Sequence, residues 1–250
     1  MRVSLPLLFV VCTGLPAWAD TFVMQGSTTF ADCLMSHFQV AIEQQSEHKL
    51  TVIPNKSIAG LLALAQGQAD FAMTSSPVER QKQLLARQHP ELSLDHSRTF
   101  EITRTRAAIV VHPDNPVAAI SQQTLRGILT GAIRNWRQLG GRDLAIRVVF
   151  VRDGGGVQAS VEEQVLDGAP ISAPEQIRVQ TSAQVAKIAE QEPGALGLAQ
   201  RNIVRQSAAR ELATERPIEQ RLSLTTLGPP SASMHKVIET IRRVAALTNQ

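Results

Sequence analysis

The chain has 250 residues, of which 25 are basic and 22 acidic, giving a formal net charge of +3. Aromatic residues make up 4% of the chain and tyrosine is absent, and no run of lysine and arginine is interleaved with aromatic residues. This composition argues against nucleic-acid binding, which favours basic stripes with aromatic partners, and against a site that stacks on sugars.

The first 19 residues have the pattern of a secretory signal peptide. Met1-Arg2 precedes an apolar run, and Ala17-Trp18-Ala19 offers a small-residue cleavage site. The run is too short for a membrane-spanning helix of about 20 residues. Cys12 raises a lipoprotein alternative, although Val11 occupies a position where lipid-modified signals favour a small residue. We therefore expect cleavage after Ala19 and a periplasmic or secreted protein.

Cleavage there leaves one cysteine, Cys33, so an internal disulfide is excluded for the mature chain. Cys33 falls on the apolar face of the first predicted helix. We expect it to be a small buried hydrophobic residue.

Strand and helix patterns alternate along the first part of the chain. Thr21–Met24 predicts a strand, and apolar residues at helical spacing from Phe30 to about Gln45 predict a helix. Lys49–Ile53 predicts a strand, Ile58–Gln66 a helix that ends at Gly67, and Asp70–Met73 a short buried strand. Short links between such elements indicate parallel β-α-β units.

The rest of the chain continues this alternation. Its predicted elements are an extended stretch over Arg98–Val111, a helix over Gln122–Leu129, a strand over Leu144–Val151, a helix with Val157, Val161 and Val165 on one face, a helix over Ser182–Gln191, a strand over Ala195–Ala199, and a final helix carrying Val237, Ile238, Ile241, Val244 and Leu247. Gln81–Ser97 and Gln206–Gln220 are polar and weakly patterned, and we expect them to be surface excursions.

Three strand-to-helix corners share one chemistry. The first carries Ser27, Thr28 and Thr29, the second Ser57 beside Lys56, and the third Gly154-Gly155-Gly156 behind Arg152. A helix begins with N–H groups that lack internal partners, and small residues let an anion approach them. A fourth loop, Thr74-Ser75-Ser76, adds hydroxyls at the carboxyl end of a strand. If these corners meet, they can hold an anion.

Several motifs make the chain resemble the PstS-like phosphate-binding proteins of ABC transporters, a family with the periplasmic binding protein fold. The motifs are Gly26–Phe30, Ala63–Pro77 ("ALAQGQADFAMTSSP"), Val110–Val117, Leu125–Gly141 ("LRGILTGAIRNWRQLGG") and Glu192–Leu198. The resemblance covers nearly all of residues 21–200. It implies an α/β fold of type II with two lobes, each a mostly parallel sheet flanked by helices.

The resemblance also implies how the chain is divided and where a ligand lies. We expect a signal peptide over residues 1–19, lobe I over 20–104 plus 205–250, and lobe II over 105–204, hinged near Thr103–Arg106 and Gln200–Val204. The implied ligand is a tetrahedral oxyanion between the lobes. Its implied contacts are Thr28, Thr29, Phe30, Ser57, Ser75, Arg152, Gly155 and Gly156.

The chain departs from the family pattern at the ligand loops. Ser75 stands where the family carries an aspartate that accepts the proton of hydrogen phosphate, and Asn55–Gly60 and Gly155–Val157 lack hydroxyls of the family motifs. An aspartate repels an anion that has no proton, so we expect poorer selection of phosphate against sulfate. Lys56 either points inward, which strengthens the positive potential, or is solvated at the rim.

The leading function is therefore a monomeric binding protein that delivers phosphate or a related oxyanion to an inner-membrane ABC permease. The alternative is a non-transport role on the same fold, as an anion sensor, scavenger or envelope interaction partner. Catalysis is not expected, because the six histidines are scattered and none pairs with Cys, Asp or Glu at ligand spacing. No cofactor or metal is implied.

Overall fold

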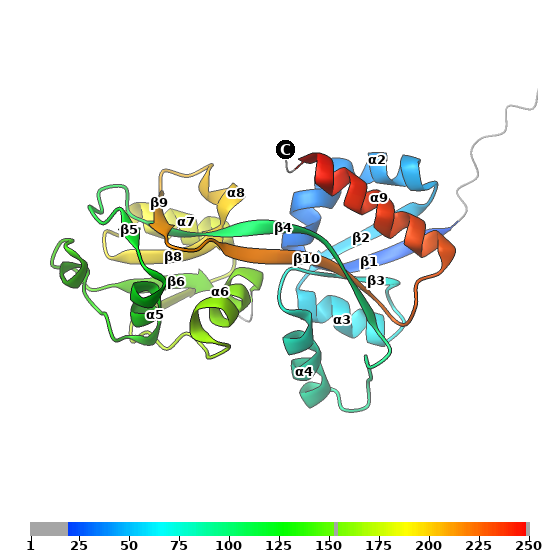
Figure 1. The fold of residues 1–250 in the computed structure, drawn as a ribbon, viewed down its shortest axis with the longest axis horizontal. Helices are drawn as coiled ribbons and strands as arrows, with labels where there is room; N and C mark the ends of the chain where they lie inside the picture. The colour runs from blue at the N-terminus through cyan, green and yellow to red at the C-terminus, as the bar shows by residue number, and fades with distance from the viewer. Residues whose placement is uncertain (1–19, 153–154, 249–250) are drawn as a thin grey trace, which may run out of the picture.

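The computed structural model describes residues 20–152 and 155–248. The predicted signal peptide and the Cys12 alternative lie outside the described residues. Within them the chain forms two lobes joined by two long strands (Figure 1).

The first lobe contains both the beginning and the end of the described chain. Its parallel strands, in the order β2-β1-β3, are β1 (Thr21–Ser27), β2 (Lys49–Asn55) and β3 (Phe71–Thr74). Its helices are α1 (Thr28–Phe30), which continues through a π-helical turn (Ala31–Met35) into α2 (Ser36–Ser46), then α3 (Ser57–Ala65), α4 (Val78–Gln88) and α9 (Ala232–Thr248). The strands and helices predicted for this region are confirmed, with ends shifted by a few residues.

The second lobe is built from the middle of the chain. Its parallel strands are β6 (Arg147–Val151), β7 (Gln176–Val179) and β8 (Ala195–Gln200), and a short pair is formed by β5 (Ala119–Ile120) and β9 (Arg210–Thr214). Its helical segments are α5 (Gln122–Thr130), a 3-10 turn (Trp136–Leu139), α6 (Gly156–Leu166), α7 (Ser182–Gln191) and α8 (Arg201–Val204).

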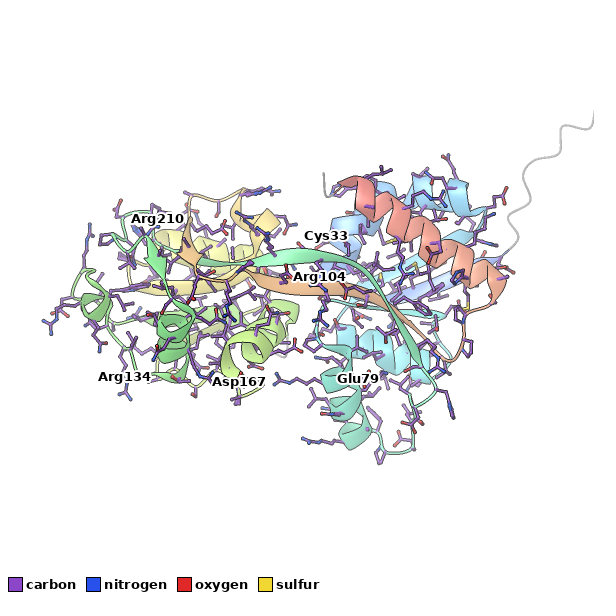
Figure 2. All side chains as sticks on the ribbon, viewed as in Figure 1. Cys33, Glu79, Arg104, Arg134, Asp167 and Arg210 are labelled. Atoms are coloured by element: carbon purple, nitrogen blue, oxygen red, sulfur yellow. The ribbon has the colours of Figure 1, made fainter. Side chains whose placement is uncertain are left out.

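Two antiparallel strands, β4 (Arg98–Val111) and β10 (Ile218–Thr226), run through both lobes (Figure 1). β10 also pairs with β3 in the first lobe, and β4 pairs with β8 and β9 in the second, so one sheet is continuous through the molecule. Arg104 lies at the crossing (Figure 2), where its guanidinium lies 2.7 Å from a carboxylate oxygen of Glu101 and 2.9 Å from one of Glu219.

Each lobe has its own hydrophobic core on both faces of the sheet. In the first lobe, Phe30, Met24 and Ile238 belong to one cluster, and α3 and α4 cover a second cluster with Leu61 and Leu85. In the second lobe, β-branched residues of β6 pack beneath α5 and α6 on one face and α7 on the other. The predicted α/β fold with two lobes is confirmed.

Three expectations about individual segments need correction. Gln81–Ser97 is not only an excursion, because α4 extends to Gln88 and buries Gln81 and Leu85. Gln206–Gln220 contains β9 and the start of β10. Gln200–Val204 is not a crossing, since it forms the end of β8 and α8, and the second connecting strand is β10.

Three further details concern packing. Leu212 and Ile218 pack in the core of the second lobe, so the segment after residue 205 contributes to both lobes, and the boundaries at residues 104 and 204 stay a prediction. Cys33 is half-buried against the first-lobe core, where burial and the neighbouring Asp32 raise the pKa of its thiol. Leu247 is exposed, whereas Val237, Ile238, Ile241 and Val244 of the same helix face the core.

Candidate anion-binding site

The first corner joins β1 to α1, and its backbone lies close to the backbone of β3. Gly26 has a φ of +135°, and a Cβ there would lie 2.2 Å from the carbonyl oxygen of Met73. Only glycine fits this turn without displacing a strand. Ser27 then caps the helix, because its Oγ accepts a hydrogen bond of 3.2 Å from the Phe30 N–H. The first N–H groups of the helix thus begin beside three hydroxyl side chains.

The second corner lies at the carboxyl end of β2. Asn55 ends the strand, and α3 begins at Ser57. The N-cap residue is Lys56, whose side chain accepts no hydrogen bond from the first N–H groups of the helix. The Ser57 Oγ accepts a hydrogen bond of 3.2 Å from the N–H of Ser75, which follows β3. This bond fixes the second corner against the Ser75 loop.

The third corner comes from the second lobe. β6 ends at Val151, and α6 begins at Gly156. Its N-cap residue is Gly155, so no N-cap side chain accepts a hydrogen bond from the first N–H groups of this helix either. A Cβ on Gly156 would lie 2.4 Å from the Ser75 Oγ and 2.8 Å from the Gln220 Nε2. The uncapped start of α6 therefore touches the Ser75 loop of the first lobe directly.

These corners enclose a cavity of about 350 Å³ between the lobes. Its lining comes from both lobes: Ser27, Thr28, Thr29, Asn55, Lys56, Ser57 and Ser75 from the first, and Val151, Arg152, Gly155, Gly156 and Gln180 from the second. Among these described residues two are cationic and none is Asp or Glu. Helix N-termini and cations without a carboxylate attract an anion.

The cavity includes seven of the eight predicted site residues. Phe30 is the exception, because its side chain is fully buried in the first-lobe core and its N–H is bonded to Ser27. Arg152 and Lys56 both line the cavity with exposed side chains, and Ser57, Ser75 and Thr29 are buried at its wall. The structure thus brings the predicted loops together, while their contact with a ligand stays a prediction.

The sequence reasoning missed several residues at this cavity. Gln180 follows β7 in a turn that carried no motif, and Asn55 was noted only as a departure from the family pattern. Gln200, at the end of β8, donates a hydrogen bond of 2.5 Å from Nε2 to the Thr29 Oγ1 across the lobes. Only tertiary pairing reveals this contact, since the two residues are far apart in the sequence.

Neither a metal-ligating cluster nor a membrane-spanning helix is found in the described ranges, 20–152 and 155–248. No group of three or more His, Cys, Asp or Glu side chains there lies close enough to hold a metal ion. No helix in the same ranges is long and apolar enough to cross a membrane.

Two lobes joined by crossing strands, with a cationic cavity between them, define a ligand-binding protein of the bilobal class. The chain belongs to the PBP superfamily, since the model of the family described as "PBP superfamily domain" matches residues 14–238. The resemblance to PstS-like phosphate-binding proteins that the motifs indicate is confirmed by the relatives below.

The phosphate-binding protein PstS of Bacillus subtilis (strain 168) is 28% identical over 179 residues, or 72% of this chain. The aligned part is 56% of that protein, so the chain spans little more than half the length of this curated relative.

Solved structures show the same fold. An ABC-type phosphate transport receptor from Vibrio cholerae aligns with a TM-score of 0.71 and 23% identity over 91% of this chain and 96% of that one. A putative phosphate ABC transporter substrate-binding protein from Clostridium perfringens, solved with bound phosphate, aligns with a TM-score of 0.69 and 18% identity over 88% of this chain and 92% of that one.

Proposed function

We propose that this protein binds phosphate or a related tetrahedral oxyanion in the interlobe cavity and delivers it to an ABC permease. One observation carries the proposal: uncapped helix starts from both lobes, with Arg152 on one side and Lys56 on the other, line a single cavity. An anion placed there gains N–H donors and two cations at once. A guanidinium can pair with two anion oxygens together.

The proposal also covers the protein's location, its partner and its hinge. The relatives are named as phosphate receptors and binding proteins of transporters, which supports a binding role without catalysis. The predicted signal peptide supports a periplasmic location, where a monomeric carrier meets an inner-membrane permease. The hinge in this proposal lies in the crossing strands β4 and β10, which are the two long connections between the lobes in Figure 1.

Calorimetry on the purified protein tests ligand binding. Titration with phosphate and with sulfate is expected to give a saturable heat for at least one anion, and native mass spectrometry should show one anion per chain. If no tetrahedral oxyanion binds, the proposal fails. Uptake of labelled phosphate and sulfate by cells with and without the gene tests delivery, and uptake that does not depend on the gene would contradict a transport role.

A further inference from the structure

Asn55 lies at the end of β2, beside both corners of the first lobe. In the parallel pairing of β1 with β2 it is in register with Ser27, the residue that caps α1. Lys56 and Ser57, where α3 starts, follow it directly in the chain. The residue also lines the interlobe cavity. Asn55 is therefore placed between the hydroxyls of the first corner and the open N-terminus of α3.

The side-chain amide of Asn55 is not used by the protein. The residue is half-buried, and its Oδ1 is buried without a hydrogen-bond partner among the described residues. Its Nδ2 makes no hydrogen bond within these residues either, so the amide is able to turn its oxygen toward a bound molecule. Buried polar atoms almost always find a partner. An unpartnered acceptor at the wall of a ligand cavity thus indicates a ligand that donates a hydrogen bond.

The other polar side chains of the described lining are less available as acceptors. Lys56 and Arg152 can only donate. Gln180 carries the second amide of the lining, but it is exposed, so solvent satisfies its oxygen. Four hydroxyls keep one lone pair but already accept a hydrogen bond from the protein: those of Ser27, Thr29, Ser57 and Ser75. The Asn55 oxygen, by contrast, has both of its lone pairs unused.

We propose that Asn55 is a specificity-determining residue whose amide oxygen accepts the hydrogen bond of a protonated oxyanion, so that the site prefers hydrogen phosphate to sulfate. This inference rests on the proposed function and specifies the chemical form of the ligand. Hydrogen phosphate brings one P–O–H donor, whereas sulfate offers only acceptors and leaves the Asn55 oxygen without a partner. A neutral amide accepts the proton but does not repel sulfate as a carboxylate does, so the preference is smaller than a carboxylate would give.

Calorimetry at mildly alkaline pH isolates this one proton, because hydrogen phosphate and sulfate then have nearly the same charge. Phosphate is expected to bind on the order of tenfold more tightly than sulfate to the unmodified protein. Sulfate binding that is as tight as phosphate binding overturns the inference but leaves the proposed function intact. Binding of neither anion defeats the proposed function itself.

Two variants of Asn55 should move the ratio of the two affinities in opposite directions. Asn55→Leu removes the acceptor at similar volume, so phosphate affinity should fall about tenfold while sulfate affinity stays within about twofold. Asn55→Asp keeps an acceptor and adds a negative charge, so sulfate should weaken more than phosphate and the ratio should rise. A merely structural role would weaken both anions alike in both variants, and that result overturns the inference.

Two further variants serve as controls for that ratio. Gln180→Met removes the exposed amide of the same cavity, so it should change both affinities by one factor. Asp153 follows Arg152 in the sequence and lies outside the described residues. Asp153→Asn is expected to leave the ratio unchanged. A ratio that falls in Asp153→Asn but not in Asn55→Leu would assign the ligand's proton to Asp153 and would overturn the inference.

Discussion

Arg152 and Lys56 line the cavity from opposite lobes and differ in what they offer an anion. A guanidinium presents a planar fork that matches two oxygens, whereas an ammonium is a strongly hydrated point charge. Both side chains are exposed, so solvent screens each charge. At the residue scale we therefore expect hydrogen-bond geometry, rather than charge alone, to decide which of the two side chains contributes more to the affinity for an anion.

Arg152→Ala should raise the dissociation constant for the bound oxyanion about ten- to a hundredfold, the range for losing hydrogen bonds to a charged group. Lys56→Met should raise it less than about fivefold, because one exposed point charge is lost. Calorimetry on both variants, with circular dichroism to check folding, makes the comparison. An unchanged constant in Arg152→Ala would place the anion elsewhere.

At the scale of elements, a buried carboxylate joins α2 to β2. The Glu43 Oε2 lies 2.8 Å from the Lys49 Nζ, and its Oε1 accepts from the Gln39 Nε2 at 2.9 Å and the Leu50 N–H at 3.0 Å. Burial alone would raise the pKa of Glu43, but the hydrogen bonds from Gln39, Lys49 and Leu50 outweigh it and lower the pKa below its ordinary value. The charged form thus stabilises this contact.

A lowered pKa gives stability that is present above the unfolded-state pKa and is lost as the pH falls through the folded-state pKa. Glu43→Gln should reduce the free energy of unfolding by about 1–3 kcal/mol at neutral pH, because its amide donor faces the Lys49 ammonium. Urea unfolding at neutral and acidic pH measures this. The gap between variant and unmodified protein should shrink in acid, and a gap that is constant with pH would contradict the assignment.

Substitutions at two glycines distinguish packing within one lobe from contact between the two lobes. A Cβ on Gly60 would lie 2.3 Å from the Gln25 carbonyl oxygen inside the first lobe, whereas a Cβ on Gly156 would meet Ser75 of the other lobe. Gly60→Ala should therefore lower stability by about 1–3 kcal/mol. Gly156→Ala should leave the melting temperature of the ligand-free protein nearly unchanged and weaken anion binding about tenfold, because the lobes cannot close fully.

Thermal unfolding and calorimetry on both variants measure these two effects. Gly155→Ala is the matched control at the same corner, since its nearest contact is a side-chain atom of Val151 at 3.2 Å. Affinity that is equal in Gly155→Ala and Gly156→Ala would mean that the contact with Ser75 does not limit closure.

At the scale of the whole molecule, one ion pair links helices of different lobes. The Arg80 Nη2 of α4 lies 2.8 Å from the Glu162 Oε2 of α6, and the Glu162 side chain is 4% exposed. Glu162 also accepts hydrogen bonds from Gln158 and Ile171 within its own lobe. Of these Glu162 contacts, only the one with Arg80 crosses between the lobes, so this pair favours the arrangement in which the lobes meet.

Arg80→Met should leave the Glu162 carboxylate without its cation and shift the ligand-free protein toward an open form. Small-angle scattering should show a larger radius of gyration without ligand and the same radius as the unmodified protein at saturating anion. Lys82→Met is the matched control, since Lys82 pairs with Glu79 on the same helix at 2.9 Å. An equal radius in all three proteins would show that the pair does not hold the lobes.

Particular segments show how much of the fold and of the candidate site could be predicted from the sequence. Strands such as Phe71–Thr74 and Arg147–Val151 and the helix over Ser182–Gln191 were predictable, because their burial follows the local period. α4 and β9 were missed, since each buries too few apolar side chains to show a period. The strand-to-helix corners predicted from the sequence bring Thr28, Thr29, Ser57, Ser75 and Arg152 to the cavity lining. Phe30 does not line the cavity, and a matching motif does not show that its N–H is bonded to Ser27.

By itself the sequence determined the alternation of strands and helices, the two-lobed family and the hydroxyl- and glycine-rich corners, because these depend on local period, turn chemistry and motif spacing. Only the tertiary structure decided that β10 forms the second crossing, that Gln200 reaches Thr29, and that Arg80 meets Glu162. These contacts join residues 82 to 171 positions apart, or strands of opposite direction. No local pattern encodes them, since they form only when both lobes have folded.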